Sequence, residues 1–220
     1  MLRTAERIEV KSVLAKCLPE FKHINHYWDK QRNIVVAKIL PGEFYMTSNA
    51  LTISTTLGSC IAACIWDDRM GIGGMNHFML PITDKSINEV DWGSRGLASD
   101  AYRYGNFAME HLVNTILKNG GYRDNLKAKV FGGGKVLKKM SDVGERNIDF
   151  VFDYLSTEKI SVVSYDVGSI YPRKVLFEPT TGRAFVKKLD NLSNDTIAQR
   201  EQDYRSSIDS GHVEGDVELF

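Results

Sequence analysis

Residues 56–81 read TLGSCIAACIWDDRMGIGGMNHFMLP, and the prediction of the core rests on this stretch. Its segment Cys60–Trp66 is apolar at every position, which is typical of a fully buried strand or a short buried helix; periodicity alone does not separate the two. Asp67–Arg69 is a polar turn, and Gly71–Leu80 returns as a strand that stops at Pro81. The stretch therefore predicts consecutive buried elements joined by a short turn.

Short strand signals lie on both sides of this stretch. They are rich in β-branched and apolar residues and are found at Asn33–Leu40, Ala50–Thr56, Ala128–Phe131, Ile160–Tyr165, Lys174–Phe177 and Ala184–Leu189. Helical spacing of apolar residues predicts helices over Asp100–Leu117 and Asn147–Leu155, and the polar residues 82–96 predict a loop. Many short strands with two main helices predict an α+β fold, in which helices pack on a layered core of mixed or antiparallel β-sheet.

The chain divides into three regions in this interpretation: an N-terminal extension over residues 1–32, a core domain over 33–189 and a C-terminal tail over 190–220. Apolar residues from Ile8 to Leu18 recur at helical spacing in the extension, and Pro19 would end that helix. The tail holds eight acidic and two basic residues and is rich in polar side chains. This composition predicts a flexible or weakly helical appendage outside the core.

The overall composition restricts the classes of function. The 220 residues include 28 basic and 28 acidic side chains, so net charge gives no argument for a nucleic-acid partner or for an anionic membrane surface. Three cysteines cannot build the disulfide framework of a small secreted domain. The sequence shows neither a signal peptide nor an apolar run long enough to span a bilayer. We therefore expect a soluble cytoplasmic protein without membrane insertion.

Cys60 is the strongest candidate for a chemical role. It follows Gly58 and Ser59 in a tight turn, where successive N–H groups can bind an oxyanion and lower the pKa of a thiol. Because a free thiol is mostly protonated at neutral pH, it needs a base, and His77 on the returning segment is the natural candidate. A hydroxyl that would orient the imidazole is available on three residues ahead of the turn: Ser54, Thr55 and Thr56.

Each of these residues also has a plain structural interpretation. A lone cysteine in an apolar run is usually a small buried hydrophobe, which we expect for Cys64 and which stays open for Cys60. A lone histidine after a glycine pair is more often structural than catalytic. A zinc site of Cys60, Cys64 and His77 would lack a fourth ligand. Residues 132–135 (GGGK) lack the spacing of a phosphate-binding loop and are either a tight turn or a glycine-lined turn near a cleft.

Two segments of the chain closely resemble the chemoreceptor glutamine deamidase family, CheD. They are residues 56–60 (TLGSC) and residues 73–81 (GGMNHFMLP). Further matching pieces are Pro41-Gly42-Glu43 with Tyr45, Arg103–Asn106 with Ala108–Glu110, Lys129–Gly133 and Thr181-Gly182. The resemblance covers about residues 33–189 and implies that this region is a deamidase-like catalytic domain.

The resemblance implies a cysteine amidohydrolase that converts particular glutamines of methyl-accepting chemotaxis proteins to glutamates, with a receptor methylesterase side activity in some members. It places the nucleophile on Cys60 and the base on His77. The family's third residue, a threonine, falls on Ser54, with Thr55 or Thr56 as substitutes. The reaction that the resemblance implies needs no metal or organic cofactor. It also implies a layered α+β fold that resembles the catalytic domain of cytotoxic necrotizing factor.

Other functions remain open at this point. Some family members dock onto a chemotaxis phosphatase of the CheC type, so a binding module is the second hypothesis. A third is a transglutaminase-like transfer with the same cysteine and histidine. Residues 166–173 depart from the family pattern, which leaves the shape of the cleft wall open. Arg95, Lys135 and Arg173 are candidate anchors for an acidic receptor surface.

Overall fold

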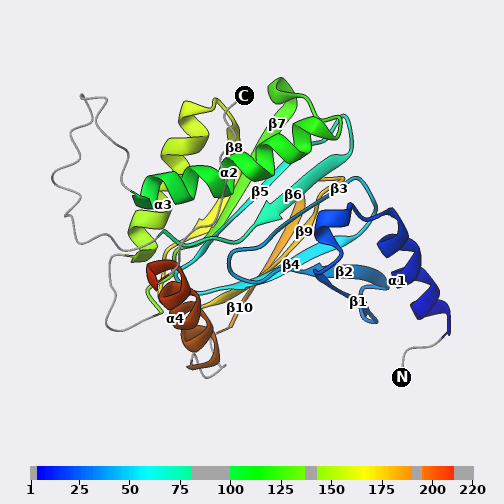
Figure 1. Ribbon diagram of the computed structural model, residues 1–220, viewed down its shortest axis with the longest axis horizontal. Helices are drawn as coiled ribbons and strands as arrows, with labels where there is room; N and C mark the ends of the chain where they lie inside the picture. Colours follow the sequence, from blue (N-terminus) through cyan, green and yellow to red (C-terminus); the bar gives the residue numbers. More distant parts are fainter. Residues whose placement is uncertain (1–3, 81–99, 137–142, 190–194, 211–220) are drawn as a thin grey trace.

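Two five-stranded sheets form the centre of the computed structural model, which describes residues 4–80, 100–136, 143–189 and 195–210 (Figure 1). Sheet A has the order β1-β2-β4-β9-β10, with β1 (Asn25–Asp29), β2 (Ile34–Lys38), β4 (Thr52–Leu57), β9 (Arg173–Glu178) and β10 (Arg183–Lys188). Sheet B has the order β3-β6-β5-β7-β8, with β3 (Phe44–Thr47), β6 (Ile72–Asn76), β5 (Ile61–Asp67), β7 (Leu126–Gly132) and β8 (Ser161–Val167). Neighbouring strands are antiparallel except for the parallel pairs β2–β4 and β7–β8.

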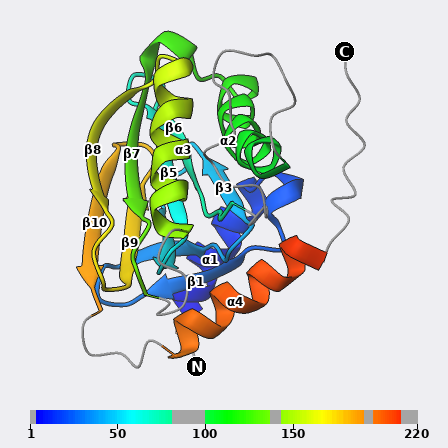
Figure 2. The same ribbon diagram turned by 90° about the vertical axis from the view of Figure 1, so that its left-hand side faces the viewer.

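Helices surround the two sheets and confirm the predicted α+β class. They are α1 (Thr4–Lys16), α2 (Asp100–Lys118), α3 (Val143–Thr157) and α4 (Asp195–Ser210), with short 3-10 turns at Pro19–Phe21 and Arg123–Asn125. Helices α2 and α3 pack on sheet B, and α1 contacts β1 and β2. Figure 2 shows α4 lying across one end of the molecule. None of the helices in the described part of the chain has the length and apolar character needed to cross a membrane.

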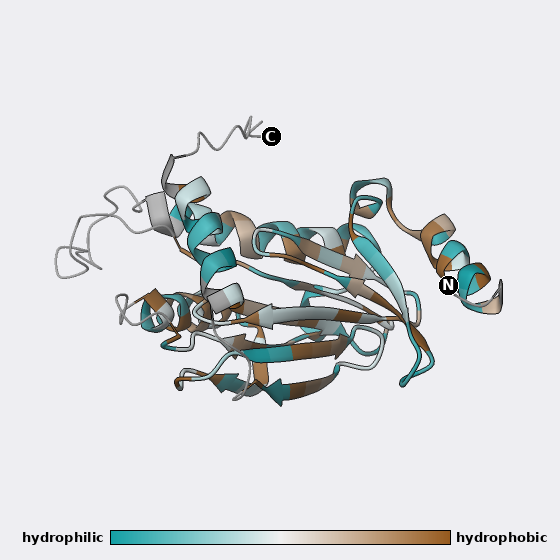
Figure 3. Cartoon of the chain, turned by 90° about the horizontal axis from the view of Figure 1, so that it is seen from below, coloured by the Kyte–Doolittle hydropathy of each residue, from teal (hydrophilic) through white to brown (hydrophobic). Residues whose placement is uncertain are grey.

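The apolar run after Cys60 forms the strand β5, which settles the choice between strand and helix. All seven residues of β5 are buried, because helices α2 and α3 contact sheet B while sheet A lies against it. The rings of Trp66 in sheet B and Phe177 in sheet A, for example, lie 6.0 Å apart. A strand that is covered on both faces shows no alternation of polar and apolar residues. Figure 3 shows brown, apolar bands along several of the strands.

Most predicted elements are present, with shifted ends. All six flanking strand signals correspond to strands, and both predicted helices form, with α3 longer at each end than expected. The returning strand β6 already ends at Asn76 instead of Leu80. Strands β1 and β3 were not predicted. Residues 82–96, predicted as a loop, lie outside the described residues.

The two chain ends are joined to the core more closely than their composition suggests. Strand β1, which lies within the predicted extension, pairs with β2 from Asn25↔Lys38 to Asp29↔Ile34. In the tail, residues 195–210 form α4, and its Glu201 is 1% exposed. This segment therefore contributes a buried side chain to the interior of the protein.

Candidate active site

The turn that carries Cys60 connects β4 in sheet A to β5 in sheet B. Its backbone is held from behind by the glycine-rich segment that follows β7: Gly133 N–H donates to Cys60 C=O at 2.8 Å, and Gly134 N–H donates to Gly58 C=O at 2.7 Å. Gly132 has φ +113°, and a Cβ there would lie 2.1 Å from the Cys60 carbonyl oxygen. Only glycine fits this position. The glycine triplet is therefore the support of the Cys60 turn.

Asn147 of α3 fixes the same turn from a second side. Its Nδ2 donates to Ser59 C=O at 2.9 Å, and its Oδ1 accepts from Leu80 N–H at 2.9 Å. The side chain is fully buried, and both hydrogen bonds satisfy backbone groups that would otherwise be unpaired. Asn147 thereby ties the turn to the segment that follows His77. The sequence places it only within a predicted helix.

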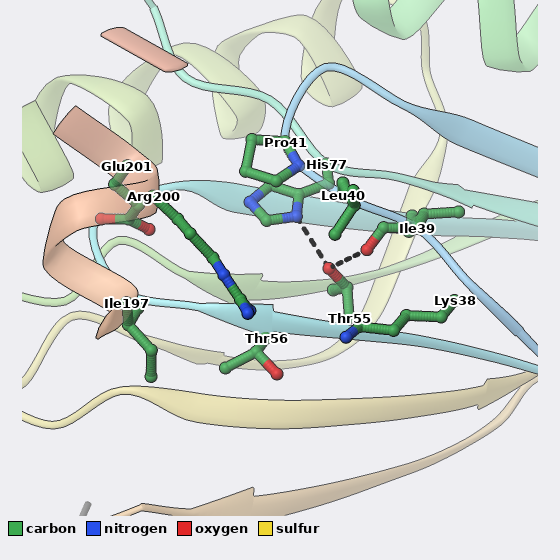
Figure 4. Close-up of a pocket in the computed structure, with 10 residues that line it drawn as sticks. All are labelled: Lys38, Ile39, Leu40, Pro41, Thr55, Thr56, His77, Ile197, Arg200 and Glu201. Carbon is green, nitrogen blue, oxygen red and sulfur yellow. Dashed lines mark hydrogen bonds between the residues drawn. The ribbon is translucent and has the colours of Figure 1, made fainter. Parts of the chain in front are cut away.

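His77 lies directly after β6, and its backbone is held by the loop between β2 and β3. His77 N–H donates to Glu43 C=O at 2.9 Å, while His77 C=O accepts from Gly42 N–H at 2.8 Å. The imidazole is 1% exposed. Its Nδ1 lies 2.7 Å from Thr55 Oγ1 on the neighbouring sheet (Figure 4). The two sheets thus bring the imidazole and the Cys60 turn to the same place.

The hydrogen bonds of Thr55 determine the tautomer of His77. Thr55 Oγ1 donates to the Ile39 carbonyl at 3.0 Å, and a carbonyl oxygen can only accept. Since a hydroxyl has one hydrogen, Thr55 Oγ1 accepts from the imidazole, and Nδ1 is the protonated nitrogen. Nε2 is buried and has no hydrogen-bond partner among the described residues. It therefore carries a free lone pair, as a general base requires.

The structure pairs His77 with Thr55, whereas the resemblance places the third residue on Ser54. Consecutive residues of β4 point to opposite faces of the sheet, so Ser54 and Thr55 cannot both reach the imidazole. Ser54 instead interacts with the hydroxyl of Tyr27. Thr56 also lies on the opposite face to Thr55. Thr55 was one of the three hydroxyls that the sequence left open.

Cys60, His77 and Glu201 form one buried cluster. The Cys60 sulfur, one ring nitrogen of His77 and one carboxylate oxygen of Glu201 all lie within 4.8 Å of one another. The thiol therefore lies close to the imidazole. Because Cys60 is fully buried, the thiol is also sealed from solvent. Glu201 comes from α4 and is separated from Cys60 by 141 residues of chain. No sequence pattern singled out this glutamate.

The Glu201 carboxylate is bound by the turn in which an oxyanion site was predicted. One oxygen accepts from Gly58 N–H at 2.8 Å and from Cys60 N–H at 3.2 Å. The other accepts from Ser59 N–H at 2.8 Å and from Ser59 Oγ at 2.6 Å. Three successive backbone N–H groups that converge on one anion form a concave anion-binding turn. The predicted oxyanion turn is thus built as an anion site, and a carboxylate of the same chain occupies it.

Burial keeps both the thiol and the imidazole neutral, and the charge of Glu201 adds to this effect only for the thiol. Burial raises the pKa of the Cys60 thiol well above its usual range, and the negative charge of Glu201 raises it further. Burial lowers the pKa of His77 to about 4, although Glu201 acts in the opposite direction. The poised thiolate expected from the sequence is therefore absent while α4 covers the site. The physical reason is the removal of water together with the addition of a nearby negative charge.

The zinc interpretation does not fit the donors of this cluster. Cys64 lies within β5 and is not part of the cluster that the described residues form. Both Glu201 oxygens already accept hydrogen bonds from N–H and O–H groups, which would repel a cation. The arrangement is therefore suited to a carboxylate or an oxyanion rather than to a metal ion.

The basic residues considered as receptor anchors have different surroundings. Arg173 is fully buried and donates to the Asp166 carbonyl and carboxylate and to the Gly168 carbonyl. It shapes the segment that departs from the family pattern and is not available as a surface anchor. Lys135 is exposed, and its Nζ lies 3.4 Å from Glu145 Oε1. Arg95 lies outside the described residues.

The buried neutral imidazole predicts a pH-dependent stability. In the unfolded chain His77 would titrate near 6.5, whereas in the fold its pKa is about 4. Between these values the unfolded chain binds more protons, so stability falls as the pH decreases from 6.5 towards 4, by up to about 3 kcal/mol from this residue. Denaturant unfolding at several pH values should show a smaller decrease for His77→Gln than for the natural chain. Equal decreases in the two chains would contradict the burial of a neutral imidazole.

Comparison with known proteins gives a consistent family assignment. A family model described as CheD chemotactic sensory transduction matches residues 79–188. A protein of Halorhodospira halophila is 52% identical over 204 residues, which is 93% of this chain and 93% of that protein. A protein of Hahella chejuensis is 47% identical, over 92% of this chain and 93% of its own length. Both are named probable chemoreceptor glutamine deamidase CheD.

A third relative shows how far the similarity extends. The protein of Methylobacillus flagellatus, with the same name, is 48% identical over 94% of this chain and 100% of its own length. The region over which the sequence resemblance was recognised, residues 33–189, holds only 157 of the 220 residues. The similarity to relatives therefore continues into the chain ends, which include β1 and α4.

Proposed function

Because this chain belongs to the CheD family, we propose that it hydrolyses side-chain amides of specific glutamines in chemoreceptors to glutamates. The observation that carries the proposal is the placement of a thiol beside an imidazole with a free Nε2, on a turn whose N–H groups bind an anion. These are the three parts that acyl transfer from an amide needs: a nucleophile, a base and an oxyanion site.

In the proposed reaction, Nε2 of His77 takes the proton of Cys60 and the thiolate attacks the amide carbon of the glutamine. The developing oxyanion accepts hydrogen bonds from the turn N–H groups of residues 58–60. The imidazolium then donates its proton to the leaving ammonia, and a thioester remains on Cys60. Water, activated by Nε2, hydrolyses the thioester to glutamate and restores the thiol. The receptor methylesterase side activity would follow the same steps with an alcohol as the leaving group.

Thr55 is the proposed positioning residue of this pair. By accepting from Nδ1–H, it keeps the proton on Nδ1 and the lone pair on Nε2. Loss of a hydrogen bond to a group that becomes charged costs about 1.5–3 kcal/mol, so Thr55→Val should lower kcat about 10- to 100-fold. Thr55→Ser should retain most activity, and Ser54→Ala serves as the matched control. An unchanged pH–rate profile and unchanged kcat in Thr55→Val would refute this role.

The proposal is tested with a purified cytoplasmic fragment of a chemoreceptor. We expect the chain to release ammonia and to convert amide to acid at discrete glutamines, which peptide mass spectrometry identifies. Heating the chain before the incubation provides the background rate. If no glutamine of the fragment is converted, by the natural chain or by the Glu201 variants described below, the proposal is wrong.

The cellular location and the binding partners are also part of the proposal. A cytoplasmic location is supported by three free thiols at Cys17, Cys60 and Cys64, because cysteines of reducing compartments remain unpaired. Chemoreceptors are the proposed substrate partners. Docking of a CheC-type phosphatase stays a prediction, which a binding assay with the purified phosphatase would test.

A further inference from the structure

Helix α4 places a glutamate side chain where the reaction would leave one. We propose that α4 is a built-in competitor of the receptor, in which Glu201 occupies the acyl site as a product-like carboxylate. The inference rests on the proposed function, because it identifies the occupant by the product of that reaction. It goes beyond that function by assigning a role to the C-terminal helix.

The chemical match between Glu201 and the product is direct. Hydrolysis of a glutamine amide yields a glutamate γ-carboxylate, which is the group that Glu201 presents. Each of its oxygens accepts two hydrogen bonds from the turn formed by Gly58, Ser59 and Cys60, at distances from 2.6 to 3.2 Å. A glutamine in the same position would keep only its carbonyl oxygen on these donors and would have to turn its NH₂ group away from them, so it would be held less tightly than a carboxylate. The site as it stands is therefore suited to product.

The position of Glu201 also distinguishes it from a glutamate that merely anchors a helix. Its carboxylate is almost fully buried, which is unfavourable unless every lone pair is satisfied. The donors that satisfy it belong to the turn of the proposed nucleophile, and the Cys60 sulfur and a His77 ring nitrogen lie within 4.8 Å. A helix that needed only an anchor would have no reason to use these groups.

Other residues of α4 hold the helix over the site. The hydroxyl of Tyr204 is hydrogen-bonded to that of Tyr104 on α2, and its ring packs against Gly42, where an added Cβ would lie 2.9 Å from the ring. Ile197 and Arg200 line a small cavity next to Thr55 and His77 (Figure 4). Because Glu201 of α4 occupies the turn N–H groups beside Cys60, a receptor glutamine and Glu201 cannot occupy this turn together.

Competition between α4 and the receptor has a specific kinetic form. A tethered competitor acts at a high effective concentration, and only the fraction of molecules with α4 displaced can bind receptor. The apparent KM is therefore raised by the inverse of that fraction. Once the receptor has displaced α4, the chemistry proceeds with the same groups, so kcat is unaffected. Release of α4 should lower KM and leave kcat unchanged.

The first experiment converts the competitor into a substrate. In Glu201→Gln, the Cys60 sulfur would bond to the side-chain carbonyl carbon of residue 201, the C–N bond would break, and ammonia would leave with a proton from His77. Water would then cleave the thioester and regenerate both the thiol and a glutamate. Peptide mass spectrometry should show residue 201 converted, while the exposed Gln199 and Gln202 on the same helix stay amides. Glu201→Gln combined with Cys60→Ala should remain unconverted.

The second experiment measures how well α4 shields the Cys60 thiol, and it does not depend on catalysis. Glu201→Lys places a cation against the turn N–H groups, and Asp203→Lys makes the same charge change at an exposed position of α4. Alkylation of Cys60 by iodoacetamide should become about tenfold faster or more in Glu201→Lys, because loss of even one charge-assisted hydrogen bond corresponds to that factor. Asp203→Lys should match the natural chain, and buried Cys64 should stay slow in all three. KM for the receptor fragment should fall by a similar factor only in Glu201→Lys.

The outcomes separate this inference from the proposed function. If the side chain introduced by Glu201→Gln stays an amide in a chain that deamidates the receptor fragment, the competitor role is refuted and the proposed function stands. Equal alkylation of Cys60 in the natural chain and both lysine variants would also refute it. If Glu201→Lys exposes Cys60 but no chain converts any glutamine, the proposed function fails, and competition with the receptor fails with it.

Discussion

Replacing Cys60 by Ala is expected to reduce conversion of receptor glutamines to the background rate, a loss of at least about 10⁴-fold in kcat. No other cysteine among the described residues belongs to the cluster with His77, so we expect no substitute thiol for the acyl intermediate. The rate is measured with the receptor fragment, in the natural chain and in Glu201→Lys, so that coverage by α4 does not hide the effect.

Cys64 provides the matched control for this experiment. It is also fully buried and lies in β5, directly after the Cys60 turn, but its sulfur is outside the cluster of Cys60, His77 and Glu201. Cys64→Ala should therefore lose some stability, as any large-to-small core substitution does, and keep its kcat. A Cys60→Ala chain as active as Cys64→Ala would contradict the assignment of the nucleophile.

Replacing His77 by Asn is expected to lower kcat about 10²- to 10⁴-fold, the usual contribution of a general acid–base group. Asparagine can still form a hydrogen bond with Thr55 but cannot take the thiol proton. The loss should be greatest near neutral pH and smaller at high pH, where hydroxide ionises the thiol without a base. Rates measured from about pH 6 to 10 test this in the Glu201→Lys background. A loss of the same size at every pH would show that His77 acts only through structure.

The sequence predicts that Cys60 and His77 lie close together because both belong to one short stretch of chain. Cys60 follows a glycine-containing turn, and His77 returns on the next strand, so local spacing alone brings them to neighbouring elements. The strand signals were equally local, and the apolar run in β5 was ambiguous only because both of its faces are buried. Strands β1 (NHYWD) and β3 (FYMT) lack such a signal, since both are short and neither shows a regular alternation of polar and apolar residues.

The choice among the three hydroxyls depends on the side of the strand that faces His77. Five of the six residues of β4 are buried, so the sequence has no exposed alternation from which to read which side faces the imidazole. Only the packing of sheet A on sheet B shows that Thr55 is the residue whose hydroxyl reaches His77. Arg173 was misjudged for a related reason, since its charge suggests exposure while three oxygen acceptors from the segment 166–168 hold it inside.

The role of α4 was beyond prediction from local pattern. Its composition is polar, and α4 docks through one buried glutamate and a tyrosine contact rather than through a broad apolar face. Glu201 is separated from its hydrogen-bond partners by 141 to 143 residues. No motif or spacing in the sequence distinguishes Glu201 from the other acidic residues among the eight in the tail. Such a long-range contact appears only when the fold is assembled.

The central claim is that Cys60 forms a thioester with the receptor glutamine, and interception by hydroxylamine tests it most directly. A thioester partitions between water and hydroxylamine, so the glutamine that becomes glutamate should also yield a hydroxamate, at a ratio that rises with hydroxylamine concentration. The account predicts both products with the Glu201→Lys chain and neither when Cys60→Ala is added. Continued formation of glutamate by the chain that lacks the Cys60 thiol would contradict it.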